Sequence, residues 1–148
     1  MPRIPHWLTV SIMIVAFLGF CDATYLTAEH FLNLIPPCFI GQGCDTVTTS
    51  AYSMIFGIPV SLLGSLYYLT VLALGLAYID LKKTWSLMML HLVTGMGLLM
   101  SMWFVFAQAF IIHAWCMYCL ISATTSTILF VLCSLAFHRK WPTKALSV

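Results

Sequence analysis

Long apolar runs dominate the chain, and charged side chains interrupt them at only a few places. Three runs contain no Asp, Glu, Lys or Arg, namely residues 4–21, 46–79 and 84–137. A membrane-spanning helix needs about 20 predominantly apolar residues, so the last run is long enough for two spans joined by a tight turn. The pattern predicts four helices, at approximately residues 7–31, 58–79, 86–108 and 113–137.

Prolines and polar residues mark the ends of these helices. Pro59 suits the first turn of the second helix, where the missing N–H of proline costs little. Residues 80–83 separate the second helix from the third, and the turn before the fourth helix is expected near residues 108–114. We therefore expect an all-α membrane protein, a four-helix bundle that forms a single domain over residues 1–148. Its largest loop, residues 32–57, is expected to carry a short interfacial helix.

Composition also indicates membrane residence. Of the 148 residues, 62% are hydrophobic and only 7% are charged, whereas a soluble domain of this length needs far more charge on its surface. With an even number of spans, all six basic residues fall on one side: Arg3, Lys82, Lys83, Arg139, Lys140 and Lys144. Basic residues concentrate on the cytoplasmic side, so both termini are expected in the cytoplasm. The net charge of +2 then reflects topology and not a nucleic-acid-binding surface.

The first apolar segment is interpreted as a retained anchor. Its apolar stretch exceeds the signal-peptide core of about 7–15 residues, and no convincing small-residue cleavage site follows it.

Two pairs of cysteines carry the chemistry that the sequence suggests. In the predicted topology Cys38 and Cys44 lie in the outer loop, while Cys116 and Cys119 open the fourth helix at the same membrane face. Residues at i and i+3 share one face of a helix, and the positive end of the helix dipole favours the thiolate, especially at Cys116. Two dithiols within reach of each other can exchange a disulfide and so pass an electron pair.

The loop pair has features of a shuttle. Two prolines stiffen the approach to Cys38, while Gly41 and Gly43 let the backbone turn toward Cys44. A disulfide that closes so short a ring stabilises the fold by only about 2 kcal/mol in the chain-entropy model. Such a bridge can open and close without dismantling the bundle.

Other roles for the cysteines stay open at this point. The outer four also fit two structural disulfides, and a CxxC motif occurs in redox, metal and haem sites alike. Haem c attachment is disfavoured because Leu120, not histidine, follows the second cysteine of the motif. A metal site with His113 as a third ligand is an alternative, although no metal is predicted. Cys21 and Cys133 lie inside predicted helices and are interpreted as small packing residues.

The ordered set of motifs resembles the vitamin K epoxide reductase family, specifically its small bacterial members. The resemblance runs from about Gly19 to Cys133. It rests on Cys38-x5-Cys44, then Ser50, then Phe56-Gly-Ile-Pro59, then Cys116-x-x-Cys119. This order, with four spans in the predicted orientation, is far more specific than any one motif.

The resemblance implies roles for the four cysteines in a bundle that holds a quinone, either ubiquinone or menaquinone. Cys119 would lie next to the quinone, and Cys116 would exchange with the loop. Cys44 would form the transient bridge to Cys116, while Cys38 would be attacked by an external partner.

The resemblance also implies which residues contact the quinone. Ser50 and Phe56 are expected to join Cys119 there. Ser50 matches the family's serine six residues after the second loop cysteine, and its alternative role is to cap a helix over residues 51–56. The animal enzymes have a tyrosine four residues after the CxxC motif, where this chain has Ala123. That difference favours a respiratory quinone over epoxide reduction.

Many bacterial relatives continue into a fused thioredoxin-like domain, whereas this chain stops at Val148. A periplasmic thioredoxin-fold protein of the DsbA type is therefore expected to act in trans. The leading hypothesis is a quinone-reducing thiol-disulfide oxidoreductase of the bacterial inner membrane that supports disulfide bond formation. Its redox cysteines would lie at the periplasmic face.

Two further polar residues are candidates for a role in this chemistry. Asp22 is the one acidic residue well inside a predicted span, and it is a candidate for proton transfer. A hydrogen bond to Tyr25 or to a neighbouring helix is the favoured interpretation. His113 could stabilise the Cys116 thiolate as an imidazolium, but an interfacial histidine at a helix end is the more common role.

Three alternatives to the leading hypothesis remain. A DsbB-type quinone reductase performs the same reaction with its CxxC motif in the first outer loop, and that order is reversed here. A soft-metal transporter would place cysteines along a permeation path. A structural or assembly subunit would keep fixed disulfides.

Overall fold

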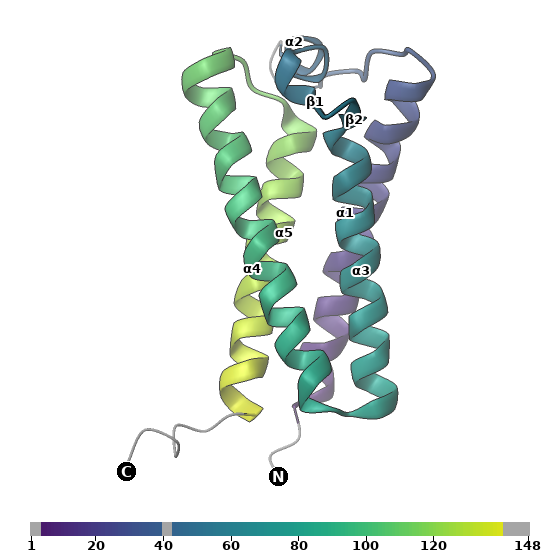
Figure 1. Cartoon of the computed structure of the whole chain (residues 1–148), viewed down its shortest axis with the longest axis vertical. Helices are drawn as coiled ribbons and strands as arrows, with labels where there is room; N and C mark the ends of the chain where they lie inside the picture. The colour runs from purple at the N-terminus through teal and green to yellow at the C-terminus, as the bar shows by residue number, and fades with distance from the viewer. Residues whose placement is uncertain (1–3, 40–42, 141–148) are drawn as a thin grey trace.

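The computed structural model of the chain describes residues 4–39 and 43–140. Within this part of the chain four helices are long and apolar enough to span a membrane. They are α1 (His6–Phe31), α3 (Val60–Leu81), α4 (Thr84–Ala107) and α5 (Met117–Lys140). The predicted all-α, four-helix membrane bundle is confirmed (Figure 1).

The four helices pack as a ring in which α1 and α4 each contact both α3 and α5. Small and aliphatic side chains fill most of the core between them: Ile12, Ala16, Ala23, Val71, Leu90, Leu129 and Cys133. Tyr68 is the large exception, and it is fully buried. Its hydroxyl lies 2.6 Å from Thr125 Oγ1 and 3.2 Å from Ser126 Oγ, so α3 and α5 share a satisfied polar contact. Gly19 of α1 leaves room for the Tyr68 ring, because a Cβ there would collide with it.

The two cysteines interpreted as packing residues have different surroundings. Cys133 is buried in the core, as predicted, whereas Cys21 is exposed on the outside of α1. The prediction for Cys21 is wrong because Gly19 and Ala23 face the core, and a step of two helical residues turns a side chain to the opposite face.

Large apolar side chains cover the outside of the bundle. They include Trp7, Phe17, Leu66, Leu76, Leu92 and Leu99, each about half exposed or more. Soluble monomers rarely expose apolar surface of this extent, whereas lipid solvates it without cost. The chain is therefore a multi-pass membrane protein.

Four of the six basic residues are described, and all lie at the end where α1 begins and α5 ends (Figure 1): Lys82, Lys83, Arg139 and Lys140. The Lys140 ammonium donates a hydrogen bond to the carbonyl of Lys82 (3.0 Å), which joins α5 to the α3–α4 turn. Arg3 and Lys144 lie outside the described residues. The clustering expected from an even number of spans thus holds for the described basic residues.

The opposite end carries the loop between α1 and α3. The expected short helix is α2 (Cys44–Thr48), followed by the 3-10 turn η1 (Ala51–Ser53). A helix over residues 51–56 does not form, because β1 (Met54–Ile55) and β2 (Ile58–Pro59) pair instead as an antiparallel hairpin. Phe56 and Gly57 both have positive φ, 52° and 80°, which suits a two-residue hairpin turn. Pro59 immediately precedes α3 and does not lie in its first turn.

Candidate active site

The structure brings the four outer cysteines together at the loop end of the bundle. Cys38 and Cys44 are joined by a disulfide, with their Cα atoms 5.9 Å apart, while Cys116 and Cys119 are free thiols. Cys44 and Cys116 are both buried in one apolar cluster, and Cys38 and Cys119 pack against it. Residues more than 70 positions apart in the sequence thus share one small site.

Gly43 lets the loop approach the segment that carries Cys116. A Cβ on Gly43 would lie only 2.8 Å from the carbonyl oxygen of Trp115 and 2.9 Å from its nitrogen. Its φ of −171° is extended, so Gly43 is needed for this close approach and not for a turn. The turn expected at Gly41 lies outside the described residues.

Tyr118 makes a second connection between the loop and α5. Its hydroxyl donates to the carbonyl of Pro37 (3.1 Å), one residue before Cys38. Its ring centre lies 5.6 Å from that of Tyr25 on α1. Two contacts therefore fix the loop disulfide against the segment that begins α5. Tyr118 bonds the residue before Cys38, and the residue before Cys44, Gly43, packs against Trp115.

Gln108 holds the backbone of Cys116 through a hydrogen bond that its side chain accepts. No role was predicted for Gln108 from the sequence. Its side chain is 2% exposed, and its Oε1 accepts a hydrogen bond from the backbone N–H of Cys116 (2.9 Å). Gln108 begins a π turn, η2 (Gln108–Ile112), that continues α4 beyond the end predicted for it. A lone amide in a long apolar run, eight residues before a CxxC motif, is the signal that could have revealed this residue.

The chain leaves η2 through His113, whose left-handed backbone (φ 54°) ends the helix. His113 is exposed, and within the described residues no hydrogen bond joins it to Cys116. Residues 4–39 and 43–140 also contain no group of three or more His, Cys, Asp or Glu side chains placed to hold a metal ion. The geometry therefore gives no support to an imidazolium beside the thiolate.

Cys116 lies one residue before α5, in the helix N-cap position, and its carbonyl accepts the first helical hydrogen bond from Leu120 (3.1 Å). A hydrogen bond from the Cys119 thiol lowers the pKa of Cys116 to about 7. Burial opposes this shift, while the backbone N–H groups of Cys119 and Tyr118 reinforce it. Cys116 is thus the thiol prepared to act as a nucleophile at neutral pH.

We expect the thiolate absorbance of the fully reduced protein to rise with a midpoint near pH 7. A lowered pKa of Cys116 means that its thiolate predominates above about pH 7. Disulfide exchange in which Cys116 is the attacking thiol should therefore accelerate from about pH 6 to 8 and then level off. Ultraviolet titration measures the midpoint, and Cys116→Ser should remove this step from the curve. A midpoint near 9 in the wild type would contradict the assignment.

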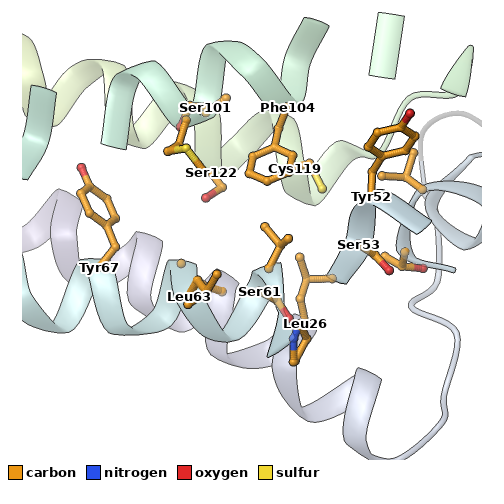
Figure 2. A pocket seen from close by; sticks show the side chains of 18 of the residues that line it. Leu26, Tyr52, Ser53, Ser61, Leu63, Tyr67, Ser101, Phe104, Cys119 and Ser122 are labelled. Carbon is orange, nitrogen blue, oxygen red and sulfur yellow. The ribbon is translucent and has the colours of Figure 1, made fainter. Parts of the chain in front are cut away.

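A cavity of about 300 Å³ lies next to the cysteines, between the halves of the four long helices that are nearer the loop (Figure 2). Cys119 lines it, together with Phe104 of α4, Ser122 and Ala123 of α5 and Tyr52 of η1. Cys116 is not among the lining residues. The two thiols of the motif therefore face different surroundings, one toward the loop cluster and the other toward the cavity.

The two other residues expected to contact a quinone differ in position. Ser50 lines the cavity, although its hydroxyl donates to the carbonyl of Val47 (2.8 Å) and makes no helix-capping bond. Phe56 does not line the cavity, and its ring is fully exposed. The hairpin turn at Phe56 and Gly57 directs this ring away from the bundle, so the geometry gives no support to a quinone contact at Phe56.

Asp22 also lines the cavity, and its surroundings differ from the favoured interpretation. Its Oδ2 atom is buried and has no hydrogen-bond partner among the described residues. No hydrogen bond joins Asp22 to Tyr25, whose ring packs on Tyr118. Asp22 is therefore a carboxyl group in the wall of the cavity and not part of a satisfied helix–helix contact.

Comparison of the sequence with known protein families gives one match. The sequence model of the vitamin K epoxide reductase family matches residues 10–134, from within α1 to within α5. The match includes both cysteine pairs. No curated protein matches the chain.

Proposed function

The chain belongs to the vitamin K epoxide reductase family, a family of membrane thiol-disulfide oxidoreductases, and we propose that it transfers electrons from a thioredoxin-fold partner to a membrane quinone. The observation that carries this proposal is the arrangement of the cysteines. Cys44 and Cys116 share one buried cluster, while Cys119 of the same CxxC motif lines the cavity. A disulfide relay could therefore begin at the loop and end at a ligand beside Cys119.

The relay would begin at Cys38, which is partly exposed, whereas Cys44 is buried. A thiolate of the partner attacks Cys38 and releases Cys44 as a thiolate. The second thiol of the partner then displaces Cys38. The partner leaves with a disulfide, and the loop pair has gained two electrons and two protons. A periplasmic protein of the DsbA type has the required dithiol.

The loop dithiol would then reduce the Cys116–Cys119 disulfide. Cys44 attacks Cys116, which lies in the same cluster, and Cys119 leaves. Cys38 resolves this bridge, so the electron pair now resides on the CxxC thiols. Re-formation of the Cys116–Cys119 disulfide delivers two electrons and two protons to the quinone, which leaves as quinol.

The cavity has properties that suit a lipid-soluble ring. Its volume is at the small end of ligand pockets, which span about 300–1,000 Å³, and its lining is mostly apolar. Leu63 of α3 and Met100 of α4 line the cavity and are also partly exposed. A quinone, either ubiquinone or menaquinone, could enter between α3 and α4 while its tail stays in lipid.

The charge distribution supports an orientation for this reaction. The basic end of the bundle would face the cytoplasm, and the cysteine cluster would then lie at the periplasmic face of a bacterial inner membrane. Disulfides persist in that compartment, and the quinone pool is within the same membrane.

An anaerobic reconstitution tests the proposed function. Purified protein in lipid nanodiscs is mixed with a reduced DsbA-type protein and a short-chain ubiquinone or menaquinone. We expect one quinol for each partner disulfide formed, measured by quinone absorbance and by thiol counting. The same protein with Cys116 and Cys119 both replaced by serine serves as the control. Partner oxidation without quinol, or no reaction with either quinone, would refute the proposal.

A further inference from the structure

Two buried side-chain polar atoms have no hydrogen-bond partner among the described residues. They are Oδ2 of Asp22 on α1 and the hydroxyl of Tyr67 on α3. Buried polar groups are nearly always hydrogen-bonded, so each exception calls for an explanation. Both residues line the same cavity, the one that Cys119 lines.

Tyr68, the next residue along α3, shows what a structural tyrosine looks like in this bundle. Its hydroxyl contacts the Ser122 carbonyl (2.9 Å) and the hydroxyls of Ser122, Thr125 and Ser126. Tyr67 lacks such partners, although its ring fits closely against Gly97 of α4. The fold thus satisfies the hydroxyl of Tyr68, whereas the hydroxyl of Tyr67 has no partner at hydrogen-bond distance; Ser126, with which it interacts more weakly, already bonds Tyr68.

The two unpartnered groups come from different helices around the cavity. Figure 2 shows Tyr67 at one end of it and Cys119 well apart from Tyr67, with Tyr52 and Ser53 beyond Cys119. Asp22 of α1 and Cys119 of α5 line the same cavity, and these two helices pack against each other. The cavity therefore has a hydroxyl group apart from Cys119 and a carboxyl group on a helix that packs against the helix of the CxxC motif.

On the basis of the proposed function, we propose that Asp22 and Tyr67 hydrogen-bond the two oxygens of the quinone, and that Asp22 relays a proton from Cys119 to the nearer oxygen. Two oxygens on opposite sides of one ring match two separated polar groups in an otherwise mostly apolar wall. Tyr67 acts as a positioning residue, because its hydroxyl donates to the farther oxygen and fixes the ring. Asp22 acts on the reacting atoms.

The proton and electron balance of this step is complete. Cys116 and Cys119 lose two electrons as the bond between their sulfur atoms forms, and the quinone gains them. The Asp22 carboxylate accepts the proton of Cys119 and passes it to the nearer quinone oxygen, so Asp22 ends unchanged. The proton of Cys116 enters water, and the second quinone oxygen takes one proton from water.

Few other titratable groups could produce the same pH dependence. Besides Asp22 and Tyr67, the titratable residues in the cavity wall are His30 of α1, Tyr52 of η1, Tyr68 of α3 and Cys119 of α5. The residues that α4 contributes to the described lining are not titratable. A change in the pH profile caused by an uncharged isostere of Asp22 would therefore report on this carboxyl group or on its charge acting on Cys116, and the ultraviolet thiolate titration of the variant separates the two.

Single-turnover oxidation of the Cys116/Cys119 dithiol by a short-chain ubiquinone tests the role of Asp22. We expect Asp22→Asn to slow this step roughly 100-fold, the scale of general acid–base catalysis, and to flatten its pH profile. Asp22→Glu should restore part of the rate and of the pH dependence. Exchange between the DsbA-type partner and the loop disulfide should stay unchanged in Asp22→Asn, which shows that the variant is folded. An unchanged pH profile in Asp22→Asn would overturn the relay.

Equilibrium binding of the same quinone tests the role of Tyr67. Tyr67→Phe should weaken binding about tenfold, the equivalent of one hydrogen bond, and leave the thermal unfolding temperature unchanged. Tyr68→Phe is the matched control, and it should lower the unfolding temperature because it breaks a satisfied network. Equal quinone affinity in Tyr67→Phe and wild type would overturn the positioning role. Failure of the wild type to reduce any quinone would instead refute the proposed function itself.

Discussion

Replacement of Cys119 with alanine is expected to abolish quinone reduction, with a loss of at least about 1,000-fold. Cys119 is the thiol of the CxxC motif that lines the cavity, and no Cys116–Cys119 disulfide can form without it. Cys116 retains its place in the buried cluster with Cys44. It should therefore attack Cys44 and release Cys38, and the resulting Cys44–Cys116 bridge can be resolved only by Cys38 and not from the CxxC motif.

Two measurements on Cys119→Ala check this result. Quinone absorbance follows the loss of turnover, and mass spectrometry of unreduced peptides identifies the Cys44–Cys116 bridge. Cys21→Ala is the matched control, because Cys21 is exposed on the outside of α1 and should be dispensable. A bridge from Cys116 to Cys38 in place of Cys44 would reverse the proposed order of the loop cysteines.

Replacement of Cys38 with alanine is expected to block oxidation of the partner while quinone binding stays intact. Cys38 is the partly exposed residue of the loop disulfide, and Cys44 is buried. A large partner can attack only the sulfur that it can reach, so the rate should fall at least about 100-fold. The cavity is not lined by Cys38, and its affinity for quinone should not change.

Cys44→Ala gives the complementary result to Cys38→Ala. Its lone Cys38 thiolate should attack the disulfide of the oxidised partner, release the second partner sulfur as a thiolate, and form a mixed disulfide that no Cys44 thiol can resolve. Thiol counting on the partner and gel electrophoresis without reductant measure both variants. Normal partner oxidation by Cys38→Ala would eliminate the shuttle role of the loop pair.

Several features of the fold were predictable because membrane helices follow local rules. A span must satisfy its backbone hydrogen bonds internally and match the thickness of the bilayer, so apolar length alone locates it. The predicted ends of the first helix agree with α1 within one residue. The family was also predictable, because the order and spacing of the cysteine motifs are properties of the linear chain.

Predictions that depended on which face of a helix meets a neighbour were less successful. Cys21 looked like Cys133 in the sequence, yet one is exposed and the other is in the core. A segment with a serine before it looked like a capped helix, but paired strands formed around Phe56 and Gly57. In both cases packing partners distant in the sequence decided the outcome.

The sequence by itself determined the spans, the placement of the described basic residues at one end and the identity of the cysteine pairs. Only the tertiary structure decided that Gln108 holds the backbone of Cys116, that Gly43 rests against Trp115, and that the cavity contains the unpartnered Asp22. The physical reason is the range of the interactions involved. Hydropathy and motif spacing can be read from residues that are close together in the sequence. A cavity and its unpaired groups, in contrast, exist only where several helices meet.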